Sequence, residues 1–284
     1  MSVISFWNAM GKENGQTSSI LALATYMAVE HNYKILVVDT TFNDKTIEKA
    51  FWKRKKENKS FKELTGGKMD ISSGAEGLIS AVASNKATPE IVINYTKIVF
   101  KNRLDILLGL KTQSFKEYKS MASSYKDLIV VASKYYDMIF VDLPKGLGNP
   151  DCDSILKFSN LILYTMPPNL ANIDLYNDLK EDSNSIVSSL KVMPLLARSD
   201  ESSSYNVRNT TKYVKEKAVI PAVPYNVRFM EATNESRLAD FMTKVKLSKA
   251  SFQENENFFE EIARSDDIIL KKLKELIKLR EFMK

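Results

Sequence analysis

Residues 8–19 contain the residue types that a phosphate-binding loop requires. The segment reads Asn-Ala-Met-Gly-Lys-Glu-Asn-Gly-Gln-Thr-Ser-Ser and ends with Gly15, Thr17 and Ser18 close together. In such a loop, glycine lets backbone amides approach an anion, a hydroxyl at the helix start can face Mg²⁺, and a lysine usually reaches the β- and γ-phosphates. Gln16 occupies the position expected for that lysine. The Gly-x-Thr-Ser pattern also suits an ordinary capped helix start, so both interpretations stay open.

Two aspartates follow apolar runs further along the chain. Asp39 ends residues 34–39, where a carboxylate could hold a metal-bound water, and Asp142 ends residues 138–142, before Leu-Pro-Lys-Gly. An apolar strand that ends in aspartate and enters a Pro/Gly turn is typical of the strand and loop that sense a γ-phosphate. Either aspartate alone could merely cap a turn. A hydroxyl pair and two carboxylates after three apolar strands, in this order, favour one shared phosphate site.

Composition excludes several other chemistries. The 284 residues carry a formal net charge of +6 and include one cysteine, Cys152, and one histidine, His31. A disulfide framework, a Cys/His zinc site and a CxxC redox pair are therefore excluded, and serine catalysis could proceed only through His31. No apolar run is long enough to span a bilayer, and the first residues lack the basic region of a signal peptide. The function must rest on backbone amides, hydroxyls, carboxylates, lysines and arginines.

The elements that would position these groups alternate between strand and helix. Uninterrupted apolar runs are typical of strands buried on both faces of a parallel sheet. Such runs occupy residues 3–7, 34–39, 104–108, 138–141, 161–164 and 192–196, with helical stretches at 18–30, 77–84, 115–134 and 173–189. The order predicts an α/β fold, with a doubly wound, mostly parallel sheet and helices on both faces. We expect one domain over residues 1–247 and a C-terminal helical extension over 248–284.

Several segments resemble the ParA/MinD group of deviant-Walker P-loop ATPases, nearest to its CpaE/TadZ-like localisation proteins. The resemblance spans residues 3–245. Its most specific segment is Val-Pro-Tyr-Asn-Val-Arg-Phe-Met-Glu-Ala-Thr-Asn-Glu at 223–235, similar to the family's segment near the adenine. The other matching segments are 34–39, the Gly-Leu helix at 77–82, the middle strand at 104–109, the Asp-x-Pro switch at 136–144 and Thr-Met-Pro-Pro at 165–168.

The resemblance implies ATP and Mg²⁺ as cofactors and assigns roles to specific residues. Asp39, Asp142 and Lys12 would be the catalytic residues, and Thr17, Asp39 and Asp142 would hold the metal or its water ligands. The nucleotide would contact Gly11, Asn14, Gly15, Gln16, Thr17, Ser18, Arg198, Pro224, Tyr225 and Asn226.

The chain departs from the family at several of these positions. The two lysines of the family's loop correspond to Gly11 and Gln16, and Lys12 lies one residue late but could stand in for one of them. Glu13 would repel a polyphosphate, Thr41 replaces an acidic residue, and Ala197 precedes Arg198 where the family has Asn-Arg. We therefore expect the fold to be retained and the catalytic set to be incomplete.

Four functions remain open. We favour a nucleotide-binding positioning or assembly protein with weak or absent ATP hydrolysis, because a lost lysine removes charge from the transition state, whereas backbone amides still cradle phosphate. The alternatives are an active ATP-switched ATPase and a nucleotide-free structural adaptor on the same fold. An unrelated metabolic or electron-transfer enzyme is a distant further possibility.

Partners are predicted from the resemblance and from two basic segments. The resemblance implies a cytoplasmic homodimer that serves a larger conjugation, pilus, secretion or partition machine. Residues 53–62 are rich in lysine and could contact DNA, although a solvated surface is the simpler interpretation. Residues 258–284 predict an amphipathic helix, docked on its own domain or on a second copy, or lying on the inner membrane face.

Overall fold

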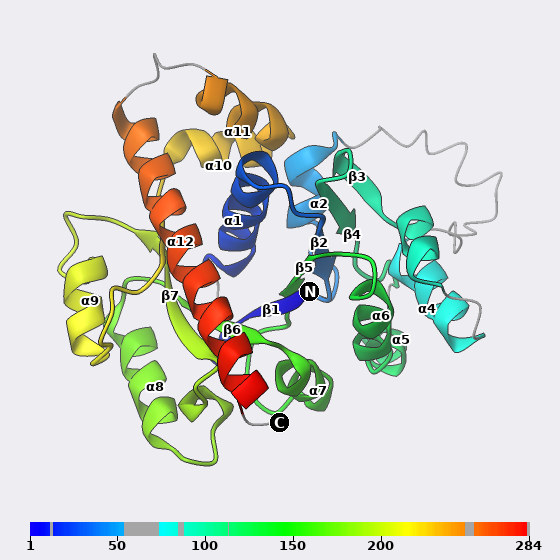
Figure 1. Ribbon diagram of the computed structural model, residues 1–284, viewed down its shortest axis with the longest axis horizontal. Helices are drawn as coiled ribbons and strands as arrows, with labels where there is room; N and C mark the ends of the chain where they lie inside the picture. The colour runs from blue at the N-terminus through cyan, green and yellow to red at the C-terminus, as the bar shows by residue number, and fades with distance from the viewer. Residues whose placement is uncertain (12–13, 54–73, 85–87, 113, 248–252, 283–284) are drawn as a thin grey trace.

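The computed structural model describes residues 1–11, 14–53, 74–84, 88–112, 114–247 and 253–282. Its centre is an eight-stranded sheet with the order β3-β4-β2-β5-β1-β6-β7-β8 (Figure 1). All neighbouring strands are parallel except β3, which pairs antiparallel with β4 at the edge. The predicted doubly wound, mostly parallel α/β fold is therefore confirmed.

Strands and helices alternate along most of the chain. The strands are β1 (Ser2–Trp7), β2 (Ile35–Asp39), β3 (Lys97–Phe100), β4 (Leu104–Leu107), β5 (Met138–Asp142), β6 (Leu161–Met166), β7 (Val192–Ser199) and β8 (Ala222–Pro224). The helices of the first half are α1 (Gln16–Glu30), α2 (Thr46–Phe51), α4 (Ala75–Ala83), the 3₁₀ helix η1 (Pro89–Tyr95), α5 (Phe115–Ala122) and α6 (Tyr125–Ala132). Those of the second half are α7 (Pro150–Phe158), α8 (Leu170–Glu181), the 3₁₀ helix η2 (Ile186–Ser188), α9 (Val207–Tyr213), α10 (Val227–Asn234), α11 (Leu238–Leu247) and α12 (Gln253–Phe282).

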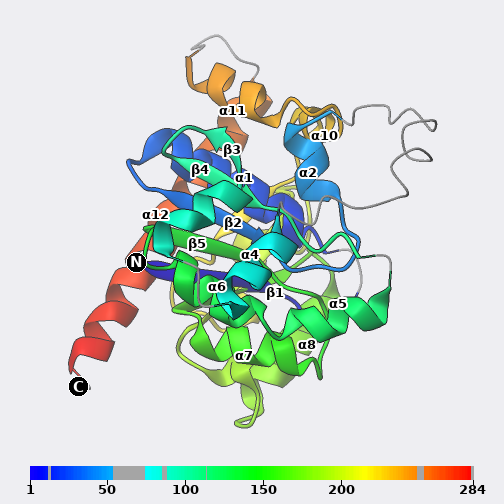
Figure 2. The ribbon, with the colours of Figure 1, turned by 90° about the vertical axis from the view of Figure 1, so that its right-hand side faces the viewer.

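Two apolar cores lie on opposite faces of the sheet. Alternate residues of each central strand enter one core or the other, as Val3 and Ile4 of β1 do. One core is completed by α4, α5, α6, α7 and α8, and the other by α1, α2, α10, α11 and α12. Figure 2 shows the sheet between these helical layers. Both faces being buried explains why the central strands read as continuous apolar runs.

The long C-terminal helix α12 packs on its own domain. Ile262 and Ile269 are fully buried in the core that also contains α1. The Ser265 hydroxyl accepts from the backbone N–H of Ala222 and donates to its carbonyl oxygen, both at 2.7 Å, and so binds α12 to the edge strand β8. The last turns extend beyond the body, and Phe282 is 89% exposed. None of the helices in the described ranges is long and apolar enough to cross a bilayer.

The sequence interpretation misses details at the edges of the fold. The short edge strands β3 and β8 are not among the predicted strands, because β3 is partly exposed and β8 spans only Ala222–Pro224. Residues 115–134, predicted as one helical stretch, form α5 and α6 with a break at Ser123 and Ser124. Serine favours such breaks because its hydroxyl competes for backbone hydrogen bonds.

Candidate functional site

The predicted loop and both predicted aspartates converge at the carboxyl edge of the sheet. β5 lies between β2 and β1, with Asp142 in register with Asp39 on one side and with Phe6 on the other. The loop from residue 8 leaves β1 at the same edge and leads into α1. Ligands of open α/β sheets bind outside the carboxyl ends of the strands. The topology therefore brings the three predicted elements to one place.

Gly15 is required where the loop enters α1. Its φ is +81°, and a Cβ built there would lie 2.9 Å from the Cβ of Ala197 and 3.2 Å from the Cγ of Arg198. The Gly15 carbonyl accepts hydrogen bonds from the hydroxyls of Ser18, at 3.1 Å, and Ser19, at 2.9 Å. Any larger residue would be strained in its backbone and would collide with the end of β7. Close packing of the Gly15 backbone against the side chains of Ala197 and Arg198 thus fixes the start of α1.

Gln16 closes the loop onto the end of β5. Its side chain is fully buried, and Nε2 donates to Asp142 Oδ1 at 2.6 Å and to the Leu143 carbonyl at 2.7 Å. The Thr17 hydroxyl donates to Asp142 Oδ2 at 2.7 Å. Both oxygens of Asp142 therefore accept a hydrogen bond from the first turn of α1. The buried Gln16 Oε1 has no hydrogen-bond partner in the described part of the chain. A neutral amide occupies the place where a phosphate-binding loop carries a cation.

The two carboxyl groups influence each other's protonation. Burial, followed by repulsion from Asp142, raises the pKa of Asp39 to about 8. Burial raises the pKa of Asp142 to about 6, against the opposing effects of the hydrogen bonds from Gln16 and Thr17 and the charge of Lys145. Because both pKa values are raised, the pair retains a proton to a higher pH than ordinary carboxyl groups do. A cation placed beside the pair would displace that proton.

The surroundings of Asp39 include Thr41, which the sequence interpretation named as a departure from the family, and Gly109 and Tyr118, to which it gave no role. Asp39 Oδ1 accepts from the backbone N–H of Thr41 at 2.9 Å and from its hydroxyl at 2.6 Å. A Cβ at Gly109 would lie 3.2 Å from the Asp39 carboxyl carbon. The Tyr118 hydroxyl donates to the Thr40 carbonyl at 2.6 Å and joins α5 to the end of β2. In the sequence, the signal for this packing was Gly109, a glycine directly after a predicted apolar strand.

Asn8 is a second organising residue that sequence reasoning missed. It is fully buried, and Nδ2 donates to the Thr165 carbonyl at 2.6 Å and to Asn172 Oδ1 at 3.3 Å. Its Oδ1 accepts from the Met10 N–H at 2.6 Å, and its carbonyl accepts from the Gly146 N–H at 2.8 Å. The loop after β1 is therefore tied to β6 and to the loop after β5. The signal for this role was a polar residue directly after a buried strand.

Arg198 lies against the loop in a strained conformation. Its φ is +53°, at a bulge where the register between β7 and β8 shifts. Its Nε is buried without a hydrogen-bond acceptor among the described residues, and a Cβ at Gly15 would lie 3.4 Å from it. A positive φ is uncommon for arginine and marks positions where the surroundings enforce it. The guanidinium is thereby held beside the N-terminus of α1.

The remaining predicted contacts are dispersed around this edge. Asn226 caps α10 by accepting from the Phe229 N–H at 2.8 Å. Tyr225 is 54% exposed and follows Pro224, where β8 ends beside the end of β7. Gly11 is exposed, and Lys12, like Glu13, lies outside the described residues.

Comparison with known proteins shows the fold. The ParA family ATPase of Chlorobium tepidum aligns with a TM-score of 0.65 and 16% identity, covering 92% of this chain and 97% of that one. A putative plasmid partition protein of Borrelia burgdorferi, bound to AMPPNP, aligns with a TM-score of 0.60 and 15% identity. The alignment covers 96% of this chain and 100% of that one. The septum site-determining protein MinD of Pyrococcus horikoshii, complexed with Mg-ADP, aligns with a TM-score of 0.60 and 17% identity. The alignment covers 95% of this chain and 98% of that one. No protein-family model and no curated protein matches the sequence.

The raised pKa of Asp39 predicts how an amide substitution changes stability. The pKa of the Asp39 carboxyl group is near 3.8 in the unfolded chain and about 8 in the folded chain. Such a group increasingly destabilises the folded state as the pH rises from the lower pKa to the higher one. Asp39→Asn should therefore raise the free energy of unfolding at pH 8, by an order of 1 kcal/mol, and flatten its decline between pH 5 and 8. Urea unfolding at both pH values measures this, with the exposed Asp127→Asn as the matched control. Equal pH dependence in Asp39→Asn and wild type would contradict the assignment.

Proposed function

We propose that this chain, which has the fold of the ParA and MinD ATPases, is a nucleotide-binding positioning or assembly protein with weak or absent ATP hydrolysis. The observation that carries the proposal is the bond between Gln16 and Asp142. It supports a loop that keeps its phosphate-binding backbone, while its uncharged Gln16 amide is committed to Asp142 and supplies no positive charge to a ligand.

The residues present fit a magnesium nucleotide in most respects. The first amides of a helix have no intrahelical acceptor and attract anions, and α1 starts at the sheet edge beside two carboxyl groups. Thr17, Asp142 and Asp39 would hold Mg²⁺ or its water, and the raised pKa values indicate carboxyl groups that would gain from a cation. Asn14, Gly15, Gln16, Thr17 and Ser18 would surround the phosphates. A bound magnesium ion would supply charge neutralisation for the phosphates.

Weak hydrolysis follows from the charge that the loop lacks. Phosphoryl transfer depends on fixed positive charge beside the oxygens that become more negative, and each such group contributes several kcal/mol. Gln16 is neutral, and its amide is bound to Asp142 and Leu143. Lys12, outside the described residues, is the remaining lysine of the loop that could take part. Slow or absent turnover is therefore a more direct consequence of this loop than loss of binding.

Arg198 supports nucleotide binding from the other side of the loop. Its strained backbone and buried, unpartnered Nε hold a permanent positive charge against Gly15. Such a charge would stabilise a phosphate at the N-terminus of α1 and offset part of the missing lysine charge. Pro224, Tyr225 and Asn226, at the end of the neighbouring strand, would border the base.

A nucleotide-free adaptor is the alternative with an observation in its favour. The hydrogen bonds of Gln16 and Thr17 already satisfy both oxygens of Asp142, so the site is internally closed without a ligand. An active ATPase is the other alternative, and it is favoured by the retained aspartates.

The partners are proposed from the structural relatives. One relative of 15% identity and TM-score 0.53 is MinD of Aquifex aeolicus in a MinC:MinD complex. By analogy we propose a cytoplasmic homodimer of the CpaE/TadZ-like kind that binds a protein of a conjugation, pilus, secretion or partition machine. DNA or the inner membrane face would be a further docking surface. Of the basic segment 53–62, only Lys53 is described by the structure.

Nucleotide binding should respond in opposite directions to two substitutions in the loop. We expect wild type to bind Mg-ATP with a dissociation constant of about 1 μM or weaker and with negligible turnover. Gln16→Lys should tighten binding about tenfold, because charge-assisted contacts are roughly twice as strong as neutral ones. Thr17→Ala should abolish the magnesium-dependent part of ATP binding. Isothermal titration calorimetry with and without Mg²⁺ measures these effects, and a phosphate-release assay measures turnover.

The matched control for these variants is Ser120→Ala, which removes an exposed hydroxyl on α5, away from the loop. Wild type that ignores millimolar Mg-ATP would favour the adaptor, and rapid phosphate release would favour the active ATPase. Either result would contradict the proposal.

The exposed end of α12 provides a test of membrane contact. Ile277, Leu279 and Phe282 are 40%, 49% and 89% exposed, next to the exposed Lys274 and Lys278. If this end binds anionic lipid, Leu279→Ser with Phe282→Ser should reduce co-sedimentation with phosphatidylglycerol vesicles several-fold while leaving the buried part of α12 unchanged. Leu190→Ser, at a residue 75% exposed outside α12, is the matched control. Equal pelleting of wild type and the double variant would remove the membrane role.

A further inference from the structure

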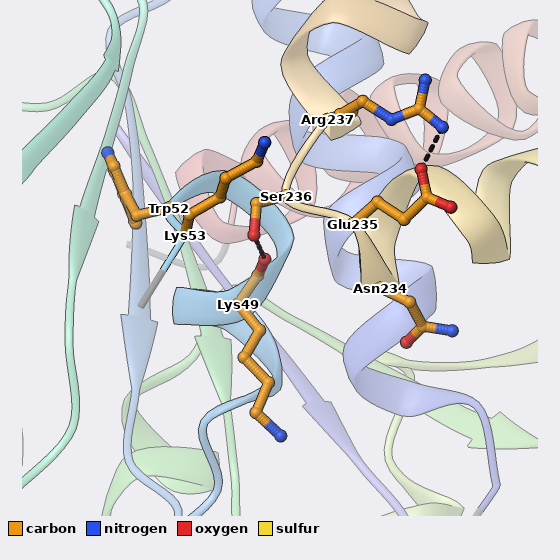
Figure 3. Close-up of a pocket in the computed structure, with 7 residues that line it drawn as sticks. All are labelled: Lys49, Trp52, Lys53, Asn234, Glu235, Ser236 and Arg237. Atoms are coloured by element: carbon orange, nitrogen blue, oxygen red, sulfur yellow. Dashed lines mark hydrogen bonds and ion pairs between the residues drawn. The ribbon is translucent and has the colours of Figure 1, made fainter. Parts of the chain in front are cut away.

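A basic hollow lies away from the phosphate loop, between α2 and the turn that joins α10 to α11. It has a volume of about 540 Å³ and is lined by Lys49, Trp52 and Lys53 on one side and by residues 234–237 on the other (Figure 3). That size is within the range of small-molecule sites. None of these residues belongs to the proposed nucleotide site.

The two sides of the hollow are joined by hydrogen bonds that give it a defined shape. The Ser236 hydroxyl donates to the Lys49 carbonyl at 2.7 Å, and Ser236 has a φ of +59°. The N–H of Arg237 donates to the Ala232 carbonyl at 2.8 Å, which closes the end of α10. Lys97 lies 5.0 Å from the centre of the Trp52 ring. Lys49 and Arg237 take part in these hydrogen bonds through their backbone atoms, so a change of charge on either side chain leaves the bonds intact.

The lining carries an excess of positive charge. Within the described residues, Lys49 and Lys53 make no ion pair, whereas Arg237 is paired with Glu235. Arg237 directly precedes α11, whose first amides have no intrahelical acceptors and attract negative charge, part of which Asp240 in the first turn already supplies. Figure 3 shows Lys53 and Arg237 extending toward the same side and Lys49 extending the other way. Among the described lining residues, Lys53 is therefore the main cation available to a ligand. Lys49 would contact the same ligand after its flexible side chain changes rotamer.

We propose that this hollow binds a small anion with several adjacent negative charges, of the oligophosphate class. A compact polyanion could contact Lys53, Arg237 and the start of α11 together, and Lys49 after reorientation. Trp52 lies in the same wall and would report occupancy through its fluorescence. The site is independent of nucleotide binding at the loop. α2 follows β2, which ends in Asp39. An anion held here would therefore restrain the segment between Asp39 and α2.

The test uses the full chain and inorganic tripolyphosphate, without magnesium. Wild type should show a saturable change in tryptophan emission, which Trp52→Phe removes while Trp7 remains. Lys53→Gln should weaken binding about fivefold, Lys49→Gln about twofold, and the double variant about tenfold, as expected for exposed charges. Lys53→Arg should stay within about twofold of wild type, as should Lys212→Gln on α9, the matched control. Because Lys53 lies outside the phosphate loop, a loss of binding in Lys53→Gln separates this site from the loop.

Calorimetry on the same proteins gives a second readout, and circular dichroism verifies that each variant is folded. The proposal is overturned by the absence of saturable binding, or by a loss in Lys212→Gln equal to that in Lys53→Gln. Tripolyphosphate binding in Lys53→Gln equal to that of wild type would place the anion elsewhere on the chain and also overturn it. A response to duplex DNA but not to tripolyphosphate would make the hollow part of an extended nucleic-acid surface and would equally contradict a small-anion site.

Discussion

The buried carboxyl group of Asp142 is the point on which the functional edge of the molecule depends. It ends the strand between β1 and β2, and each of its oxygens accepts a hydrogen bond from the first turn of α1. A buried carboxylate without partners would be costly, so Gln16 and Thr17 stabilise the strand end as well as the loop. The same contacts leave Gln16 Oε1 without a partner among the described residues. The site is thus stable without a ligand but retains an unsatisfied polar atom at its centre.

Other constraints position the loop around that carboxyl group. Asn8 fixes the loop's beginning to β6, whereas Gly15 fixes its end against Ala197 and Arg198. Arg198 is held at a positive φ, and its buried Nε has no acceptor in the part of the chain that the structure describes. A ligand could relieve the backbone strain at Arg198 and accept a hydrogen bond from its Nε. Together they support a loop shaped for an anion although Gln16 supplies no charge to it.

Most of the fold was predictable from the sequence, because strands buried on both faces must be apolar throughout. The runs that became β1, β2, β4, β5, β6 and β7 carry this signal, whereas the short edge strands β3 and β8 do not. The convergence of Thr17, Asp39 and Asp142 was predictable, since parallel strands end at one edge. The bond between Gln16 and Asp142 joins residues far apart in sequence, and the orientation of an amide leaves no local pattern. The roles of Asn8 and Tyr118, and the strain at Arg198, depend in the same way on tertiary neighbours.

The most direct test of this account is the hydrogen exchange of the Gln16 side-chain amide, followed by NMR. Its resonances can be assigned by their loss in Gln16→Met. If Nε2 donates to Asp142 and Leu143, both amide protons should exchange far more slowly than those of exposed glutamines. Added Mg-AMPPNP should shift these resonances if the loop holds a nucleotide. Exchange as fast as that of an exposed glutamine would contradict the closed loop on which the proposed function rests.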